Sequence, residues 1–136
     1  MSKHIIQVPD GHPVFGSTAV FGAFKYSPAV KAGGLVFVAG QIGLRADGTI
    51  PETAQEQADW AFKRLGVILA AAGLGFGDLV ELVTYHVDID KQLADFRQVK
   101  DRYVTEDFPA WTILGVAALA RSTLLVEIRA VAAART

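Results

Sequence analysis

Residues 108–132 read FPAWTILGVAALARSTLLVEIRAVA, a stretch that is almost wholly apolar. Two runs of aliphatic, β-branched and aromatic residues flank a short polar break at Arg121, Ser122 and Thr123. Runs of this kind are typical of strands, and the shortness of the break predicts a tight connection between them. We therefore expect the chain to end in two strands joined by a tight turn.

The second of these strands carries an acid among apolar residues. The side-chain period of two places Leu125, Glu127, Arg129 and Val131 on one face and leaves the other face wholly apolar. A carboxylate taken out of water must be paired, hydrogen-bonded or protonated. The spacing leaves two interpretations of Glu127. It forms an ion pair with Arg129 or another cation on a half-exposed sheet face, or it is a carboxylate that takes part in chemistry.

Length and composition fit one globular domain over residues 1–136. Hydrophobic residues make up 51% of the chain, and the mean hydropathy of +0.33 is high enough that we expect partner subunits to cover some apolar surface. Thirteen basic and fourteen acidic residues give a formal charge of −1, without a basic run or tail. This balance predicts neither nucleic acid nor a membrane as a partner.

Cysteine is absent, which excludes disulfides, a thiolate nucleophile and a cysteine-based metal site. His4, His12 and His86 are the only imidazoles, and we predict no metal site and no cofactor. His86 could lie near a pocket, but a histidine without a partner is usually structural. The N-terminus lacks the apolar core of a signal peptide, and no window approaches the roughly 20 apolar residues of a membrane span, so a cytoplasmic protein is expected.

The remaining helices and strands are predicted from the spacing of apolar residues, and their ends from the positions of proline and glycine. Residues 1–24 are rich in both, so an irregular segment is expected there. The expected order is then a hairpin (26–42), a helix (53–73), a strand (79–87), a second helix (90–104) and the two C-terminal strands. Two helices on one face of a mostly antiparallel sheet form an α+β sandwich. The uncovered face predicts burial against copies of the chain.

Three motifs together resemble a known family. They are Phe-Pro-Ala at residues 108–110, the closing strand at 126–132, and Ala-Gly-Gln-Ile at 39–42. They resemble the reactive intermediate deaminase (RidA/YjgF) family of enamine and imine hydrolases, and the resemblance runs over residues 26–132. It implies a chorismate-mutase-like α+β fold assembled as a homotrimer, with small-molecule pockets at the three clefts between subunits.

The resemblance also implies roles for individual residues. In the family, a glutamate on the last strand handles the water that hydrolyses an imine, and this residue matches Glu127. The pocket tyrosine matches Tyr26. The glycine at the end of the first long strand matches Gly40, with Gln41 beside it in the substrate pocket. We expect Glu127 to be catalytic and the other three to bind substrate.

Two positions depart from the family pattern. Trp111 stands where the family has an arginine that clamps the substrate carboxylate, and Ile113 stands where a cysteine is common. A bidentate arginine clamp contributes roughly 1.5–3 kcal/mol, and an indole with one N–H cannot replace it. We therefore expect Trp111 and Ile113 to line a more apolar cleft, with Trp111 as a stacking wall.

The expected function is hydrolytic deamination of an imine- or enamine-like small molecule other than a simple α-imino acid. The alternative is a non-enzymatic trimer that binds a small ligand or a protein in the same clefts and keeps Glu127 for assembly. A third possibility is that Arg129 or Arg121 turns into the cleft and restores an anion site.

Overall fold

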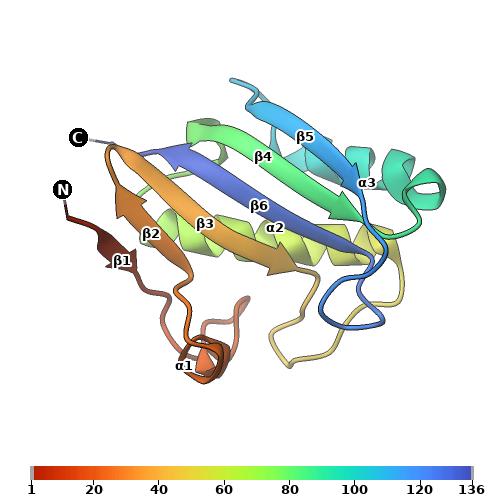
Figure 1. Cartoon of the computed structure of the whole chain (residues 1–136), viewed down its shortest axis with the longest axis horizontal. Helices are drawn as coiled ribbons and strands as arrows, with labels where there is room; N and C mark the ends of the chain where they lie inside the picture. Colours follow the sequence, from red (N-terminus) through yellow and green to blue (C-terminus); the bar gives the residue numbers. More distant parts are fainter. Residues whose placement is uncertain (1, 136) are drawn as a thin grey trace.

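The computed structural model describes residues 2–135, which form a six-stranded sheet with helices packed against it (Figure 1). The strands are β1 (His4–Ile6), β2 (Ala29–Ala32), β3 (Leu35–Ile42), β4 (Leu79–His86), β5 (Ala110–Gly115) and β6 (Val126–Ala133). The helices are α1 (Ala19–Phe24), α2 (Ala54–Ala71), α3 (Ile89–Tyr103) and the 3-10 turn η1 (Phe76–Asp78). None of these helices is long and apolar enough to cross a membrane.

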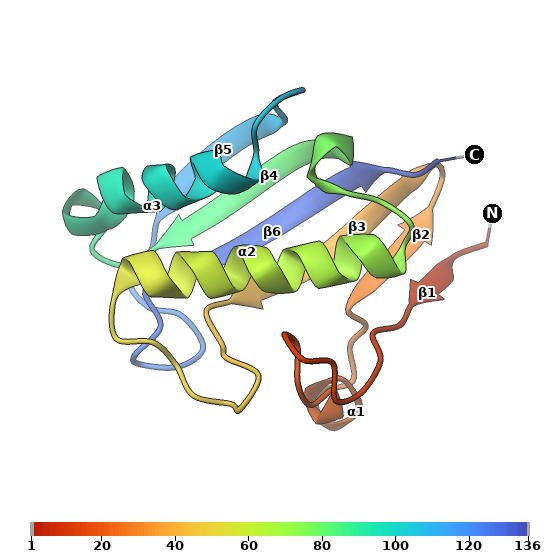
Figure 2. The ribbon, with the colours of Figure 1, turned by 180° about the vertical axis from the view of Figure 1, so that it is seen from behind.

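The strands lie in the order β1-β2-β3-β6-β4-β5. All neighbours are antiparallel except β4 and β5, which are parallel. Figure 2 shows α2 and α3 together on one face of the sheet. The predicted α+β fold, with a mostly antiparallel sheet and two long helices on one face, is therefore confirmed.

The expected tight connection between the last two strands is wrong. β5 pairs with β4 at the edge of the sheet, whereas β6 lies between β3 and β4. Residues 116–125 connect β5 to β6, and the polar break at 121–123 is exposed within this longer connection. The physical reason is burial. β6 is apolar on its helix-covered side and takes the central place, while the crossover through α3 makes β5 parallel to β4.

The expectation of an irregular N-terminal segment is also partly wrong. His4–Ile6 forms the short edge strand β1 against β2, and Ala19–Phe24 forms the helix α1. Glycine and proline correctly predict the turns between these elements. They do not exclude a three-residue strand, because an edge strand needs hydrogen bonds on one side only.

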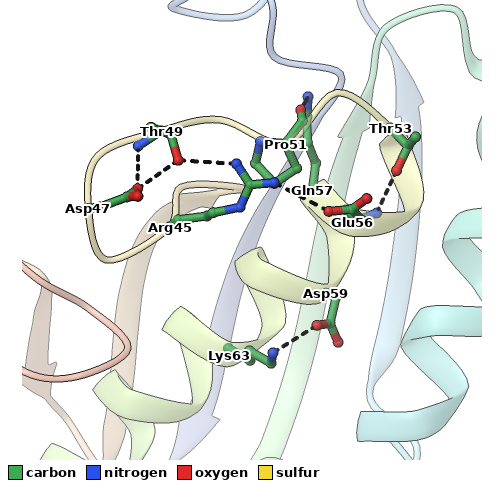
Figure 3. Close-up of polar contacts among 9 residues, drawn as sticks. All are labelled: Arg45, Asp47, Thr49, Pro51, Thr53, Glu56, Gln57, Asp59 and Lys63. Carbon is green, nitrogen blue, oxygen red and sulfur yellow. Dashed lines mark hydrogen bonds and ion pairs between the residues drawn. The ribbon is translucent and has the colours of Figure 1, made fainter.

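Helix α2 lies within the predicted range 53–73. The Thr53 hydroxyl accepts a hydrogen bond from the Glu56 backbone N–H at 3.1 Å (Figure 3). The Glu56 carboxylate does not complete a capping box, because it contacts Arg45 at 3.4 Å. At the other end, Gly73 adopts a φ of +75° directly after the C-cap residue Ala72.

The two faces of the sheet differ. On the helix-covered face, the β6 residues are at most 2% exposed and pack in one core with α2 and α3; they are Val126, Ile128, Ala130 and Ala132. On the opposite face, here called the open face, no helix covers the sheet (Figures 1 and 2). Phe37 on that face is 47% exposed beside its cross-strand partner Val131.

Candidate functional site

Glu127 lies on the open face near the start of β6. Its cross-strand partners are Ile42 of β3 and Tyr85 of β4. The residue is half-buried, and within residues 2–135 its carboxylate forms no hydrogen bond or salt bridge. Burial raises the pKa of this carboxyl above its usual value of 4.5. The sheet therefore presents a desolvated carboxylate without a counterion, which is a stronger base than an ordinary glutamate.

Gly40 makes room for that carboxylate. In β3, Ala39 and Gly40 together stand opposite Arg129 alone, which is a β-bulge. A Cβ added at Gly40 would lie 2.2 Å from Oε2 of Glu127. Only glycine therefore allows the carboxylate to lie against the backbone of β3. The resemblance assigned Gly40 and Glu127 to one substrate pocket, and in the structure they lie directly against each other.

Tyr26 belongs to the same site. Its side chain is 43% exposed, and its ring packs edge-on against Phe21 with 5.0 Å between centroids. Burial raises the pKa of the phenol, Arg64 lowers it and Glu127 raises it further. Tyr26 is thus close enough to both charges to respond to them. Gly40 thus lies directly against Glu127, and Tyr26 lies within electrostatic range of that carboxylate.

Gln41 lies on the other side of β3. It pairs with Ile128 of the core face and is 4% exposed. Its side-chain amide donates to the Ala39 carbonyl at 2.9 Å. Gln41 is therefore placed to support the bulge that positions Gly40, and it does not face Glu127.

Trp111 and Ile113 are not brought beside Glu127 within the chain. The indole N–H of Trp111 donates to the Thr84 hydroxyl at 3.0 Å, and its ring packs near Phe96 of α3. Ile113, two residues further along β5, pairs with Thr84 and is 38% exposed. Both therefore belong to the helix-covered side of β5. A stacking wall at Trp111 would require the indole to leave this packing.

A buried hydrogen-bond network holds Trp111 there. Gln92 Nε2 donates to the carbonyls of Val87 and Leu125, so Gln92 Oε1 accepts from Nδ1 of His86 at 2.9 Å. The other ring nitrogen, Nε2, then accepts from the Thr84 hydroxyl at 2.8 Å. Burial lowers the pKa of His86, which keeps the ring neutral. His86 is a satisfied structural residue in this network.

Neither Arg129 nor Arg121 pairs with Glu127 in the described chain. Arg129 lies on the open face and donates through Nε to the Tyr85 hydroxyl at 3.3 Å. Arg121 is exposed in the β5–β6 connection. The ion pair considered for Glu127 and Arg129 is therefore not formed. Among residues 2–135, no group of three or more histidines and acids is arranged to hold a metal ion.

Sequence analysis missed Arg64 of α2. This side chain is 4% exposed, and its guanidinium lies 3.8 Å from the centroid of the Phe15 ring. Its position was nevertheless detectable. Arg64 stands three residues after Ala61 and four before Ile68, inside the apolar stripe of the helix, where a charge is unusual.

The chain is similar to proteins of one family. A family model described as endoribonuclease L-PSP matches residues 17–134. The RutC family protein YjgH of Escherichia coli K12 is 38% identical over 106 residues, which cover 77% of this chain and 81% of that protein. The 2-iminobutanoate/2-iminopropanoate deaminase of Mus musculus is 36% identical over 112 residues, covering 79% of each chain.

A solved structure gives the same result. The structure described as protein YJGH has a TM-score of 0.80 and 35% sequence identity, and the match covers 92% of this chain and 97% of that one. Family model, relatives and fold therefore agree with the resemblance carried by the motifs. The chain belongs to the endoribonuclease L-PSP family, which is the YjgF/RidA family of reactive intermediate deaminases.

Proposed function

We propose that the protein is a hydrolytic deaminase that acts on an imine- or enamine-like small molecule. The observation that carries the proposal is the half-buried, unpaired carboxylate of Glu127 lying against Gly40 and beside Tyr26. The relative from Mus musculus is named as an imine deaminase, which supports this reaction class.

Glu127 has the properties of a general base for this reaction. Water held by the carboxylate gives it a proton as the water oxygen bonds to the imine carbon, and the imine nitrogen takes up a proton. The Glu127 carboxyl then returns its proton to the amine of the carbinolamine, the C–N bond breaks to release ammonia, and the hydroxyl gives its proton to solvent as the carbonyl forms. An enamine first tautomerises to the imine. A raised pKa strengthens the base at neutral pH, and general-base catalysis typically contributes a factor of about 100 to 10,000 in rate.

The substrate differs from a simple α-imino acid. Such a substrate needs a cation next to the imine carbon, and the family position for that cation holds Trp111, whose indole is fixed toward α3. Little turnover of the imines formed from serine or threonine is therefore expected.

Assembly as a homotrimer is part of the proposal. The open face exposes apolar side chains such as Phe37 and Leu114 without any helix above them. Packing of this face against copies of the chain would bury these residues and enclose Glu127 in a cleft between subunits. Light scattering should give a trimer mass, and a monomer mass independent of concentration would contradict the enclosed site.

A non-enzymatic ligand-binding trimer is the alternative function. The inward position of Trp111 favours it, because the chain lacks the cation with which the family clamps its substrate carboxylate. Under this alternative, the clefts bind a small ligand or a protein without turnover, and replacing Glu127 changes affinity or assembly only.

The test compares ammonia release from aliphatic and aromatic imines by the parent protein, Glu127→Gln and Glu81→Gln. Glutamine keeps the shape of glutamate and removes the base, so Glu127→Gln should lose about 100- to 10,000-fold in rate. Glu81 is a matched control, because it lies on β4 opposite Val131 of the open face and is also partly buried. Equal rates for the two variants, or no turnover by the parent protein, would overturn the proposal.

A further inference from the structure

Two buried glutamines hold the chain where it enters β6. Gln57 of α2 is fully buried, and Gln92 of α3 is 5% exposed. The Leu125 N–H donates to Oε1 of Gln57 at 2.8 Å, and the Leu125 carbonyl accepts from Nε2 of Gln92 at 2.7 Å. Leu125 comes two residues before Glu127. The backbone that leads to Glu127 is therefore fixed by side chains from both long helices.

Every polar atom of the Gln57 side chain has a partner. Besides accepting from Leu125, the side-chain amide donates through Nε2 to the carbonyls of Pro51 and Thr123, both at 2.9 Å. Figure 3 shows Gln57 beside Pro51 at the start of α2. These three bonds fix the amide in one orientation, because turning it over would exchange its donor and its acceptor. Gln57 thus joins the start of α2 to residues 123–125.

The backbone that leaves β3 lies against the same glutamine. A Cβ added at Gly43 would clash with the Cα and the Cβ of Gln57. Gly43 directly follows Ile42, which is the last residue of β3 and the cross-strand partner of Glu127. Only glycine therefore allows the end of β3 to lie this close to α2. Gln57 contacts both chain segments that meet at the pair of Ile42 and Glu127.

Glu127 lies where the pairing of β6 with β3 ends. The last pair is Ile42 with Glu127, so β3 does not hold the residues before Glu127. On the β4 side the pairing continues through Val126, and Gln57 supplies the contact that β3 lacks. The space for the carboxylate is narrow, because it lies where a Cβ on Gly40 would be. A shift at the start of β6 would therefore move the carboxylate relative to β3.

We propose that Gln57 is a positioning residue for Glu127. It holds the start of β6 and the end of β3 in the arrangement that places the carboxylate against Gly40. This inference rests on the proposed function and adds a residue on which its base depends. Gln57 belongs to the helix-covered side, so it acts through the backbone and not on the substrate. A misplacement of about 1 Å can cost about 100-fold in rate, so loss of Gln57 should reduce turnover as well as stability.

The experiment follows the Glu127 carboxyl in Gln57→Met, which keeps the size of the side chain and removes its hydrogen bonds. Carbon-13 NMR gives the pKa of Glu127, hydrogen exchange gives the protection of the Leu125 amide, and ammonia release from aromatic imines gives kcat and KM. Leu69→Ala is the matched control, because it removes buried contacts at the other end of α2 and keeps the bonds of Leu125. Gln57→Asn keeps the amide on a side chain one methylene shorter, and it provides the test if Gln57→Met does not fold.

In the parent protein the Leu125 amide should exchange as slowly as the core amides of β6. Gln57→Met should speed this exchange about 10-fold relative to those amides. The pKa of Glu127 should fall toward its usual value, because a carboxylate that leaves β3 is better solvated. A fall in kcat of about 10- to 100-fold is expected, with a smaller change in KM. Gln57→Asn should lie between the two, and Leu69→Ala should lose stability while the pKa of Glu127 stays raised.

A loss of stability in Gln57→Met with an unchanged Glu127 pKa and an unchanged kcat would show that the glutamine is merely structural and would overturn the inference. Equal changes in Leu69→Ala would do the same, and so would a Leu125 amide that exchanges freely in the parent protein. A Glu127 pKa that depends on Gln57, without turnover of any imine by the parent, would leave the placement standing and contradict the proposed function. Turnover that is lost in Glu127→Gln and kept in Gln57→Met would do the reverse.

Discussion

Adjacent strands of this protein place two polar groups on opposite faces of the same sheet. On the helix-covered face, Gln92 and Thr84 are the partners of the two ring nitrogens of His86, and the Thr84 hydroxyl also accepts from the Trp111 indole. On the open face, Glu127 is half-buried, and its carboxylate has no hydrogen-bond or ion-pair partner among residues 2–135. A satisfied buried network stabilises one arrangement of side chains, whereas an unsatisfied carboxylate is available to a ligand. We therefore assign a structural role to the His86 network and a chemical role to Glu127.

The largest effect on stability is expected from Gln92→Leu in the helix-covered network. Leucine leaves His86 Nδ1–H and the Val87 carbonyl without a partner, which should lower the free energy of unfolding by about 2–4 kcal/mol. Urea denaturation measures the change, with exposed Gln98→Leu on α3 as the control. Equal stability of the two variants would show that the network is not structural.

Gly40→Ala tests the open face. We expect it to lower the free energy of unfolding by about 1–3 kcal/mol. The new Cβ would meet Oε2 of Glu127 at 2.2 Å, so the carboxylate must move away from β3. Imine hydrolysis should therefore fall together with the moderate loss of stability. Gly75→Ala is the control, because a Cβ there meets nothing within 4 Å. Full activity in Gly40→Ala would contradict the placement of the base.

The pH dependence of stability should have opposite signs for His86 on the helix-covered face and for Glu127 on the open face. The pKa of His86 is lowered in the folded chain, so protons bind preferentially to the unfolded chain. The contribution of His86 is therefore complete above its ordinary pKa of about 6.5 and falls as the pH drops through that value toward the folded pKa. Denaturation between pH 8 and pH 5 should show this loss in the parent and in His4→Gln. A flat profile would contradict the neutral, buried ring.

For Glu127, lowering the pH should increase stability, and the change should be smaller than the loss expected from His86. Its pKa is raised in the folded chain, so the ionised carboxylate opposes folding above the folded pKa, and this opposition disappears below about 4.5. Glu127→Gln should be equal to or slightly more stable than the parent at pH 7, and no more stable at pH 4. Marked destabilisation at pH 7 would indicate that the carboxylate has a cationic partner.

The fold was predictable where periodicity and capping determine it. The predicted range 53–73 contains α2, and the apolar alternation of β6 correctly assigns its two faces. The neighbours of β6 were not predictable from local sequence, because strand order depends on which strands bury both edges. A short polar break is equally compatible with a hairpin and with the longer connection over residues 116–125.

The site was predictable only in part. The motifs identified Glu127 and Gly40, which are in contact in the structure, and Tyr26, whose phenol is within electrostatic range of Glu127. They did not indicate that Trp111 faces the helices, because strand alternation gives opposite faces without saying which one α3 covers. Arg64 was missed because it lies in a helix remote in sequence from every motif, where only its place in an apolar stripe marks it.

The most direct test of the central claim is the pKa of the Glu127 side chain. Carbon-13 NMR of the glutamate side-chain carboxyls, titrated with pH and assigned with Glu127→Gln, reports this value in the intact protein. A desolvated carboxylate without a counterion should titrate clearly above 4.5. Titration at or below 4.5 would show that a cation or several hydrogen bonds stabilise the charge, and Glu127 would then be a structural residue.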